Sequence, residues 1–129
     1  MKLLILAALL GITLAKVSNI TVKGIAVCNK KRVPGLKIEL MEEDGVSLDD
    51  KLATVNTDDQ GNFNVFGKDD EWGTIEPYLF IYHKCRVKKE GCWTRTRYEV
   101  PQAKINGVYD MTYVTLDVAQ ADEKAVNCA

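Results

Sequence analysis

Histidine is nearly absent from this sequence of 129 residues, which has one, His83. A mechanism that needs two histidines is therefore excluded. An excess of either charge is also missing, because 17 Lys and Arg residues against 18 Asp and Glu residues give a formal net charge of −1. This balance gives no support to a dedicated nucleic-acid-binding protein. The chain is 47% apolar and 27% charged, which favours one folded domain over a disordered chain.

No apolar run is long enough to span a membrane. The longest, Leu3–Leu14, follows the basic Lys2 and has twelve residues, whereas a spanning helix needs about 20. Thr13 and Ala15 place small side chains at the −3 and −1 positions of a cut after Ala15. This layout is typical of a secretory signal peptide, and a buried N-terminal helix is the alternative. We therefore expect residues 1–15 to be removed and the protein to be secreted into the extracellular space.

Pairs of cysteines in the C-x2-C spacing of common zinc sites are also missing. The four cysteines all follow residue 15, and they are Cys28, Cys85, Cys92 and Cys128. In an exported domain, four cysteines most often form two disulfides. The alternative is a metal site that includes His83 and Cys85, which oxidising export and the single histidine disfavour. We expect no metal ion and no cofactor.

One sequon for N-linked glycosylation, Asn19-Ile20-Thr21, lies just after the predicted cleavage point. The export route carries a chain past the enzymes that attach a glycan to such an asparagine. Asn19 is therefore a candidate glycosylation site, which would make the protein a glycoprotein. An unmodified Asn19 is the alternative.

After residue 15, the pattern of apolar residues predicts strands rather than helices. The expected strands span residues 20–28, 36–40, 52–57, 62–66, 78–85, 94–100 and 109–118. Leu36–Leu40, for example, alternates apolar and charged residues, as a half-buried strand does. Turn signals such as Pro34-Gly35 and Asp58–Asn62 separate the strands. Seven short, evenly spaced strands indicate an all-β sandwich, followed by a tail at residues 119–129.

Several short motifs follow one another along these strands. They are Val22-Lys23-Gly24, Pro34-Gly35, Thr57-Asp58 with Gly61 and Phe63, Ile81-Tyr82-His83-Lys84-Cys85, and Val100-Pro101. In these motifs the sequence resembles the transthyretin-like family of secreted nematode proteins, over about residues 20–118. The resemblance implies secretion and a seven-stranded prealbumin-like sandwich, which we place at residues 16–118. It implies no particular chemistry, because a shared fold does not by itself transfer a function.

Relatives that hydrolyse 5-hydroxyisourate use more than one histidine, an arginine and a C-terminal Tyr-Arg-Gly-Ser. The present chain has one histidine and ends in Val126-Asn127-Cys128-Ala129. The proton-transfer groups of that reaction are therefore missing, and we expect no enzymatic activity. We interpret His83 as a structural residue near the disulfides, with catalytic or metal-binding use as the alternative.

The topology that the resemblance implies also bears on the disulfides. In it, the first and fifth strands finish at the same end of the sandwich, where Cys28 and Cys85 both point inward. The inward face expected for the fifth strand consists of Leu79, Ile81, His83 and Cys85. We favour a Cys28–Cys85 disulfide, with Cys92–Cys128 pinning the tail. The rival pairing joins Cys85 to Cys92 and Cys28 to Cys128, and the sequence leaves this choice open.

Charge is segregated along the chain. Residues 39–76 contain twelve acidic and two basic residues, whereas residues 84–97 contain six basic and one acidic residue. In the implied topology, the turn after the first strand lies beside the segment after the fifth, so one basic end is expected. Its candidate binding residues are Lys30, Lys31, Arg32, Lys84, Arg86, Lys88 and Lys89. Such an end attracts anionic lipid headgroups, sulfated glycans or an acidic protein, and ordinary solvated charge is the alternative.

Taken together, these features favour a secreted, non-enzymatic binding protein. The expected partner is an extracellular protein, an anionic lipid headgroup or a glycan, and neither nucleic acid nor a membrane span is expected. The main alternative is an oligomeric carrier of a small apolar ligand, which would need several copies of the chain to enclose a channel.

Overall fold

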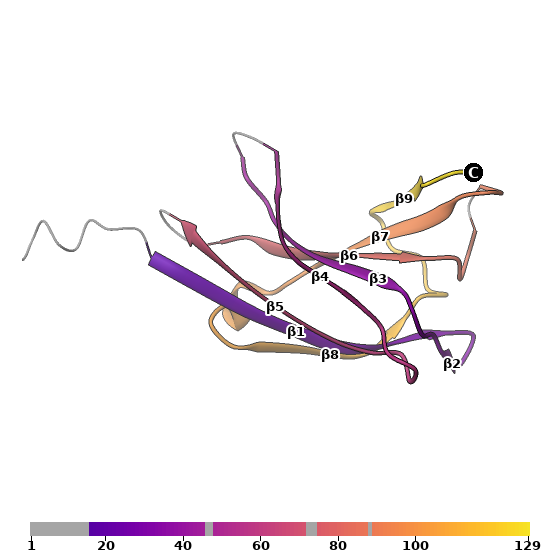
Figure 1. The fold of residues 1–129 in the computed structure, drawn as a ribbon, viewed down its shortest axis with the longest axis horizontal. Helices are drawn as coiled ribbons and strands as arrows, with labels where there is room; N and C mark the ends of the chain where they lie inside the picture. The colour runs from indigo at the N-terminus through magenta and orange to yellow at the C-terminus, as the bar shows by residue number, and fades with distance from the viewer. Residues whose placement is uncertain (1–15, 46–47, 72–74, 88) are drawn as a thin grey trace, which may run out of the picture.

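Figure 1 shows a computed structural model of the chain, in which two layers of β-strands face each other. The structure describes residues 16–45, 48–71, 75–87 and 89–129. The predicted leader, residues 1–15, and the candidate binding residue Lys88 lie outside the described residues. Within the described ranges, no helix has the length and apolar character needed to cross a membrane.

The first sheet is built around a long central strand, β1 (Lys16–Cys28). Its neighbours are β2 (Lys31–Arg32), β5 (Asn62–Glu71) and β8 (Val108–Thr115). Strands β2 and β5 pair with one edge of β1 in antiparallel fashion, and β8 runs parallel to β1 along the other edge. Along β1, Ile20, Val22 and Ala26 are buried while Lys23 is exposed, so alternate side chains face the core and the solvent.

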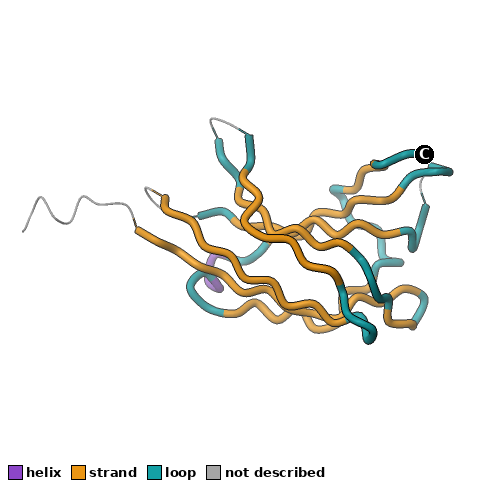
Figure 2. The backbone as a smooth tube through the Cα atoms, viewed as in Figure 1, coloured by secondary structure: helices purple, strands orange, loops and turns teal. Residues whose placement is uncertain are grey.

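The second sheet contains five antiparallel strands. In spatial order they are β4 (Asp50–Asn56), β3 (Lys37–Glu42), β6 (Pro77–His83), β7 (Trp93–Glu99) and β9 (Glu123–Val126). One short 3-10 helix, η1 (Gln102–Lys104), lies between β7 and β8. Figure 2 shows that strands make up most of both layers and that short loops join them.

The hydrophobic core lies between the two sheets. Its fully buried side chains include Ile20, Val22 and Val65 from the first sheet and Ile38, Leu40, Leu79 and Ile81 from the second. Burial of one such side chain contributes roughly 1.5–3 kcal/mol before the cost of ordering the chain. The core therefore fixes β1 against β6, and with them the residues at the ends of these two strands.

The strands predicted from the sequence are all present, as β1, β3, β4, β5, β6, β7 and β8. Their bounds differ most in β5, which continues to Glu71 through acidic sequence that predicts a loop. The added residues pair with the start of β1, for example Asp69 with Ser18, so a long partner strand extends the ladder into polar sequence. Strand β8 ends at Thr115 rather than Val118 because the chain turns there, with the Val118 N–H donating to the Thr115 carbonyl.

The C-terminal segment, residues 119–129, is more ordered than the tail that its sequence predicts. Strand β9 pairs with the outer edge of β7, from Trp93 opposite Val126 to Thr96 opposite Glu123. A strand of four residues has too few apolar positions to show a pattern in the sequence. Its order comes from pairing with β7 and from the disulfide at Cys128.

Two disulfides are present, Cys28–Cys85 and Cys92–Cys128. This is the pairing that the implied topology favours over its rival. The first disulfide joins the end of β1 to the segment after β6, with its Cα atoms 5.7 Å apart, and so ties the first sheet to the second. The other disulfide holds the chain after β9 to the start of β7.

Candidate functional site

The disulfide end of the sandwich consists of the β1–β2 turn, the segment from Lys84 to Val87, and the Cys28–Cys85 bridge between them. Figure 1 shows this turn and the connection from β6 to β7 at one end of the molecule. The turn is a two-residue hairpin loop in which Asn29 and Lys30 have positive φ angles of 49° and 67°. Such a loop reverses the chain tightly, and it leaves the Lys30 side chain in solvent.

Most of the predicted basic residues are exposed at this end. They are Lys30, Lys31, Arg32, Lys84 and Lys89. None of these five has an ion pair with another described residue. The nearby carboxylates are those of Asp58, which interacts electrostatically with Arg32, and Asp117, which accepts a hydrogen bond from the Asn29 N–H at 3.3 Å. Several cations in one region create a positive surface potential, and this group of five is here called the cation cluster.

Arg86 does not belong to the cation cluster, and its prediction as a binding residue is corrected by its contacts. Its guanidinium donates to the carbonyls of Leu116 and Val118, each at 3.3 Å, and to the Glu123 carboxylate at 2.6 Å. The Glu123 side chain is 1% exposed and that of Arg86 is 29% exposed. The charge of Arg86 is therefore neutralised by a buried carboxylate, and its hydrogen bonds connect the segment after β8 to β9.

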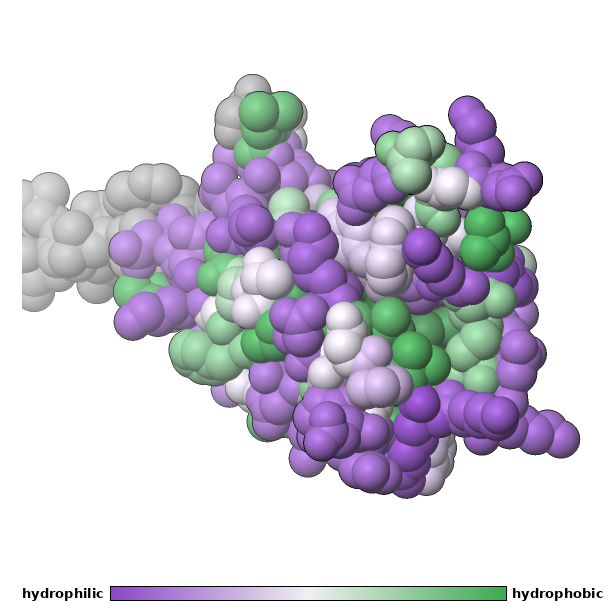
Figure 3. Space-filling model, turned by 45° about the vertical axis from the view of Figure 1, so that its right-hand side comes forward, coloured by the Kyte–Doolittle hydropathy of each residue, from purple (hydrophilic) through white to green (hydrophobic). Residues whose placement is uncertain are grey.

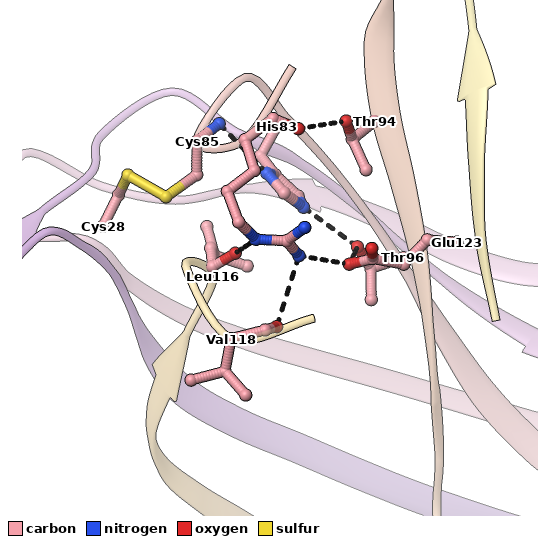
Figure 4. Close-up of polar contacts among 9 residues, drawn as sticks. Cys28, His83, Cys85, Thr94, Thr96, Leu116, Val118 and Glu123 are labelled. Atoms are coloured by element: carbon pink, nitrogen blue, oxygen red, sulfur yellow. Dashed lines mark hydrogen bonds and ion pairs between the residues drawn. A yellow bond between two sulfur atoms is a disulfide. The ribbon is translucent and has the colours of Figure 1, made fainter. Parts of the chain in front are cut away.

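His83 lies at the base of this end and is connected to the same ion pair (Figure 4). The Cys85 backbone N–H donates to Nδ1 of His83 at 3.2 Å, so the proton resides on Nε2, which lies 2.9 Å from Thr96 Oγ1. The Thr96 hydroxyl in turn donates to the Glu123 carboxylate at 3.1 Å. Both ring nitrogens are therefore engaged within the protein, which favours a structural role for His83.

The charge state of His83 follows from its surroundings. Burial lowers the pKa of His83, the Glu123 carboxylate acts in the opposite direction, and the Arg86 guanidinium lowers it further. The imidazole is therefore neutral near pH 7. The sequence pointed to His83 but not to Glu123 or Thr96, because Glu123-Lys124-Ala125-Val126 does not alternate apolar and polar residues and so shows no strand pattern.

A pocket of about 280 Å³, here called the end pocket, opens at the disulfide end between the two sheets. Its lining consists of Cys28, Val33, Leu36, His83, Lys84, Cys85, Trp93 and Leu116. The Lys84 ammonium lies 4.7 Å from the centre of the Trp93 ring, so a cation stands beside a largely apolar wall. Figure 3, which turns this end toward the viewer, shows an apolar area with hydrophilic residues around it. This pocket is not predictable from the sequence, because its lining comes from separate segments of the chain.

The other arginines of the basic stretch 84–97 lie elsewhere, on the outer face of the second sheet. There, three cations stack on the aromatic row of β6. These pairs are Arg97 over Tyr78 at 3.7 Å, Arg95 over Phe80 at 4.1 Å and Lys37 over Tyr82 at 4.3 Å. Arg97 also forms ion pairs with Glu43 and Glu99 at 3.0 Å. The basic stretch is thus divided between two surfaces, because alternate residues of β7 point away from the core.

The outer face of the first sheet has a broader hollow, of about 510 Å³. Its lining includes Lys23, Ile25, Asn64, Asp110 and Tyr113. Beside it, Phe66, Val108 and Tyr113 are large apolar residues that are more than half exposed. The candidate glycosylation site, Asn19, lies on this face of β1 and is partly exposed, so a glycan on it would stand at the rim of this face.

Three carboxylates approach one another at the end of the sandwich opposite the disulfides. Ligand oxygens of Glu42, Asp50 and Asp69 lie within 4.8 Å of one another. Calcium prefers six to eight oxygen ligands, and acidic side chains at this distance are common without an ion. We therefore assign no metal site to this cluster.

The sequence of this chain is similar to proteins of one family. A sequence model described as the TTR-52 transthyretin-like family matches residues 23–101. Transthyretin-like protein 16 of Caenorhabditis elegans is 49% identical over 121 residues, which cover 94% of this chain and 92% of that protein. Transthyretin-like protein 5 of the same organism is 32% identical over 126 residues, covering 90% and 91%. Among solved structures, an (S)-allantoin synthase aligns over 94% of this chain and 47% of that one with a TM-score of 0.49 and 8% identity, a likeness too weak to support an argument.

Proposed function

Because the chain belongs to the transthyretin-like family, we propose that it is a secreted, non-enzymatic binding protein whose disulfide end recognises an anionic partner. The observation that supports this most directly is the cation cluster, in which five exposed basic side chains have no ion pair with a described residue. The chemistry that such a cluster favours is a group of sulfates, phosphates or carboxylates on an extracellular glycan, lipid headgroup or protein.

The platform under the cation cluster is rigid. Lys30 follows the last residues of β1, Lys84 directly precedes Cys85, and the Cys28–Cys85 disulfide joins these two segments. A partner that binds there needs to order only the outer parts of the lysine side chains, which reduces the entropic cost of binding. The disulfide therefore contributes to recognition by holding two basic segments side by side.

Secretion is supported by the predicted leader at residues 1–15 and by the absence of a free cysteine among the described residues. Disulfides persist in oxidising compartments and are rare in the cytosol. Glycosylation of Asn19 remains a proposal of the same kind, since the residue is partly exposed in β1. Intact-mass measurement of naturally secreted protein checks both, through the mass of the leader and of any glycan.

The non-enzymatic part of the proposal rests on His83. General acid–base catalysis needs a titrating group that reaches the substrate, whereas both nitrogens of His83 are engaged by Cys85 and Thr96. We therefore expect no acceleration of 5-hydroxyisourate hydrolysis when the protein is added. A rate above the uncatalysed one that disappears in His83→Gln would contradict this part.

Heparin, a sulfated glycan, serves as the probe for the cation cluster. Wild-type protein should bind a heparin column at low salt, and Lys30→Gln/Lys31→Gln should elute at clearly lower salt, because each lysine contributes about 1 kcal/mol near an anionic surface. Lys68→Gln/Lys104→Gln removes two exposed cations from outside the disulfide end and should elute with the wild type. Failure of the wild type to bind, or equal shifts in both double variants, would refute the proposed function.

A carrier of a small apolar ligand is the second candidate, and the hollow on the first sheet supports it. The exposed Phe66, Val108 and Tyr113 flank this hollow, and a second copy that covered this face would enclose it. This function requires an oligomer. A monomeric mass by light scattering, at concentrations near those in the organism's fluids, would remove the carrier.

A further inference from the structure

We propose that the end pocket binds a small organic acid, with the apolar body of the ligand between the two sheets and its carboxylate at Lys84. The ligand class is a compact aryl carboxylate or a medium-chain fatty acid. This inference deepens the proposed function, because it rests on the same disulfide end and names a ligand chemistry for it.

The walls of the end pocket favour an apolar body. Val33, Leu36 and Leu116 supply aliphatic surface, Trp93 supplies an aromatic one, and the Cys28–Cys85 bridge closes a side. Apart from Lys84 at the entrance, the ionisable side chain of the lining is His83, which already engages both ring nitrogens within the protein. An apolar ligand therefore enters without leaving a buried polar group unpaired, which would otherwise oppose binding.

The size of the end pocket limits the ligand. Its volume of about 280 Å³ lies just below the range of roughly 300–1,000 Å³ that is usual for drug-sized ligands. A whole phospholipid with two long chains does not fit into this space. A single short chain or one aromatic ring does, which is why we infer a small acid rather than a membrane lipid.

The charge at the entrance favours an anion. Lys84 lines the end pocket, its ammonium lies 4.7 Å from the Trp93 ring centre, and no carboxylate is among the lining residues that the structure describes. A carboxylate at this point would make a charge-assisted hydrogen bond with Lys84. A neutral molecule with the same apolar body would gain the apolar contacts alone.

Isothermal titration calorimetry of the oxidised protein with octanoate, acetate and octanol separates the contribution of the apolar body from that of the carboxylate. Octanoate should bind, acetate should not because it lacks an apolar body, and octanol should bind about tenfold more weakly than octanoate because it lacks the charge. Lys84→Gln should bring octanoate close to octanol and leave octanol unchanged. Lys104→Gln, at an exposed lysine distant from the pocket, should behave like the wild type.

Val33→Trp places a large ring in the end pocket and should abolish octanoate binding. As Val33 packs against the core, a melting curve must show that this variant is folded. If it is not, nuclear Overhauser contacts between octanoate and the Leu36 and Leu116 methyl groups in the wild type decide the question. No octanoate binding, equal affinity for octanol, or contacts only to other parts of the surface would overturn the inference.

The two proposals can fail separately. Val33→Trp keeps the whole cation cluster and should retain wild-type affinity for heparin, whereas Lys30→Gln/Lys31→Gln keeps the pocket lining and should retain octanoate binding. Heparin binding without octanoate binding would leave the proposed function and remove the end-pocket ligand. Octanoate binding without heparin binding would do the reverse.

Discussion

Two arginines of this protein make ion pairs in contrasting surroundings. At the disulfide end, Arg86 binds Glu123, whose side chain is 1% exposed. At the opposite end of β6, Arg97 binds Glu43 and Glu99, whose side chains are 45% and 70% exposed. The same two chemical groups meet in both places, at 2.6 Å and 3.0 Å.

The difference between them is what can replace a lost partner. Water can solvate the exposed carboxylates, and a second carboxylate remains beside Arg97 when one is removed. The loss of one ion pair there therefore changes the free energy of unfolding little. Glu123 has no such access to water, and its carboxylate also accepts a hydrogen bond from Thr96, which leads to His83. Removing a member of a buried pair leaves a charge with reduced solvation, which is costly. We therefore expect the stability of the fold to depend on the disulfide end far more than on the Arg97 cluster.

The largest expected effect comes from removing the bridge that frames the disulfide end. Cys28→Ser/Cys85→Ser opens a loop of 57 residues, and the loss of chain restraint should lower the free energy of unfolding by about 4 kcal/mol. Urea denaturation of the secreted protein measures this. Cys92→Ser/Cys128→Ser, which opens a loop of 36 residues, is the comparison and should leave the link between the two sheets intact. A loss below about 1 kcal/mol for the first variant would contradict its structural importance.

The next largest effect should come from Glu123 itself. Glu123→Gln keeps the shape of the side chain but removes the charge that neutralises Arg86, and it should cost about 2 kcal/mol. Glu99→Gln removes an exposed carboxylate from the Arg97 cluster and is the matched control, with an expected change within about 0.5 kcal/mol. Equal losses of stability in the two variants would contradict the expectation that the fold depends more on the buried ion pair than on the exposed one.

The strands that hold the disulfide end were largely predictable from the sequence. Alternation within residues 78–85 placed Leu79, Ile81 and His83 inward, and all three are buried in β6. The inward direction of Cys28, the last residue of β1, follows from the same two-residue period. These predictions succeed because a strand buried on one face has little freedom in the direction of its side chains.

The partners of Arg86 were not predictable in the same way. Glu123 is separated from Arg86 by 37 positions, and the segment between them crosses from the second sheet to β8 of the first and back again. The sequence shows Arg86 within a run of exposed lysines and gives no sign that it turns inward. Contacts of this kind depend on where a short edge strand such as β9 docks, and that depends on the assembled sheet rather than on local propensity.

Acid should weaken the disulfide end before it affects the rest of the fold. Because the pKa of folded His83 lies below its usual value near 6.5, the unfolded chain takes up a proton that the folded protein does not. Stability is therefore complete above pH 6.5 and declines as the pH falls below it, by at most about 1.4 kcal/mol for each pH unit. The carboxyls of Asp49 and Asp58, whose pKa values are lowered by hydrogen bonds from Tyr78 and from the Asn62 N–H, lose their contributions only below about pH 4.

Melting curves at pH 7.5, 6.5 and 5.5 check this prediction. His83→Gln is the control, since it is neutral throughout this range and should show a flatter dependence than the wild type, although it is less stable at pH 7.5. A wild-type melting temperature that does not change between pH 7.5 and 5.5 would show that His83 accepts a proton in the folded protein at little cost.

Apart from the Glu99→Gln control, the smallest effect is expected at Arg97, although its guanidinium forms ion pairs with two carboxylates and stacks on Tyr78. Arg97→Gln removes ion pairs with exposed carboxylates, each of which contributes about 0.5 kcal/mol or less. It also removes the stacking of the guanidinium on the buried Tyr78 ring, which contributes about 1 kcal/mol. The freed carboxylates become solvated, so the loss should be about 1 kcal/mol and should shrink further in 1 M salt, where charges are screened beyond about 3 Å. Urea denaturation at low and high salt measures both values. A loss of stability as large as that of Glu123→Gln, or one that salt does not reduce, would mean that packing on Tyr78 holds Arg97 in place. The exposure of the partner carboxylates would then not explain the difference in stability between the two ends.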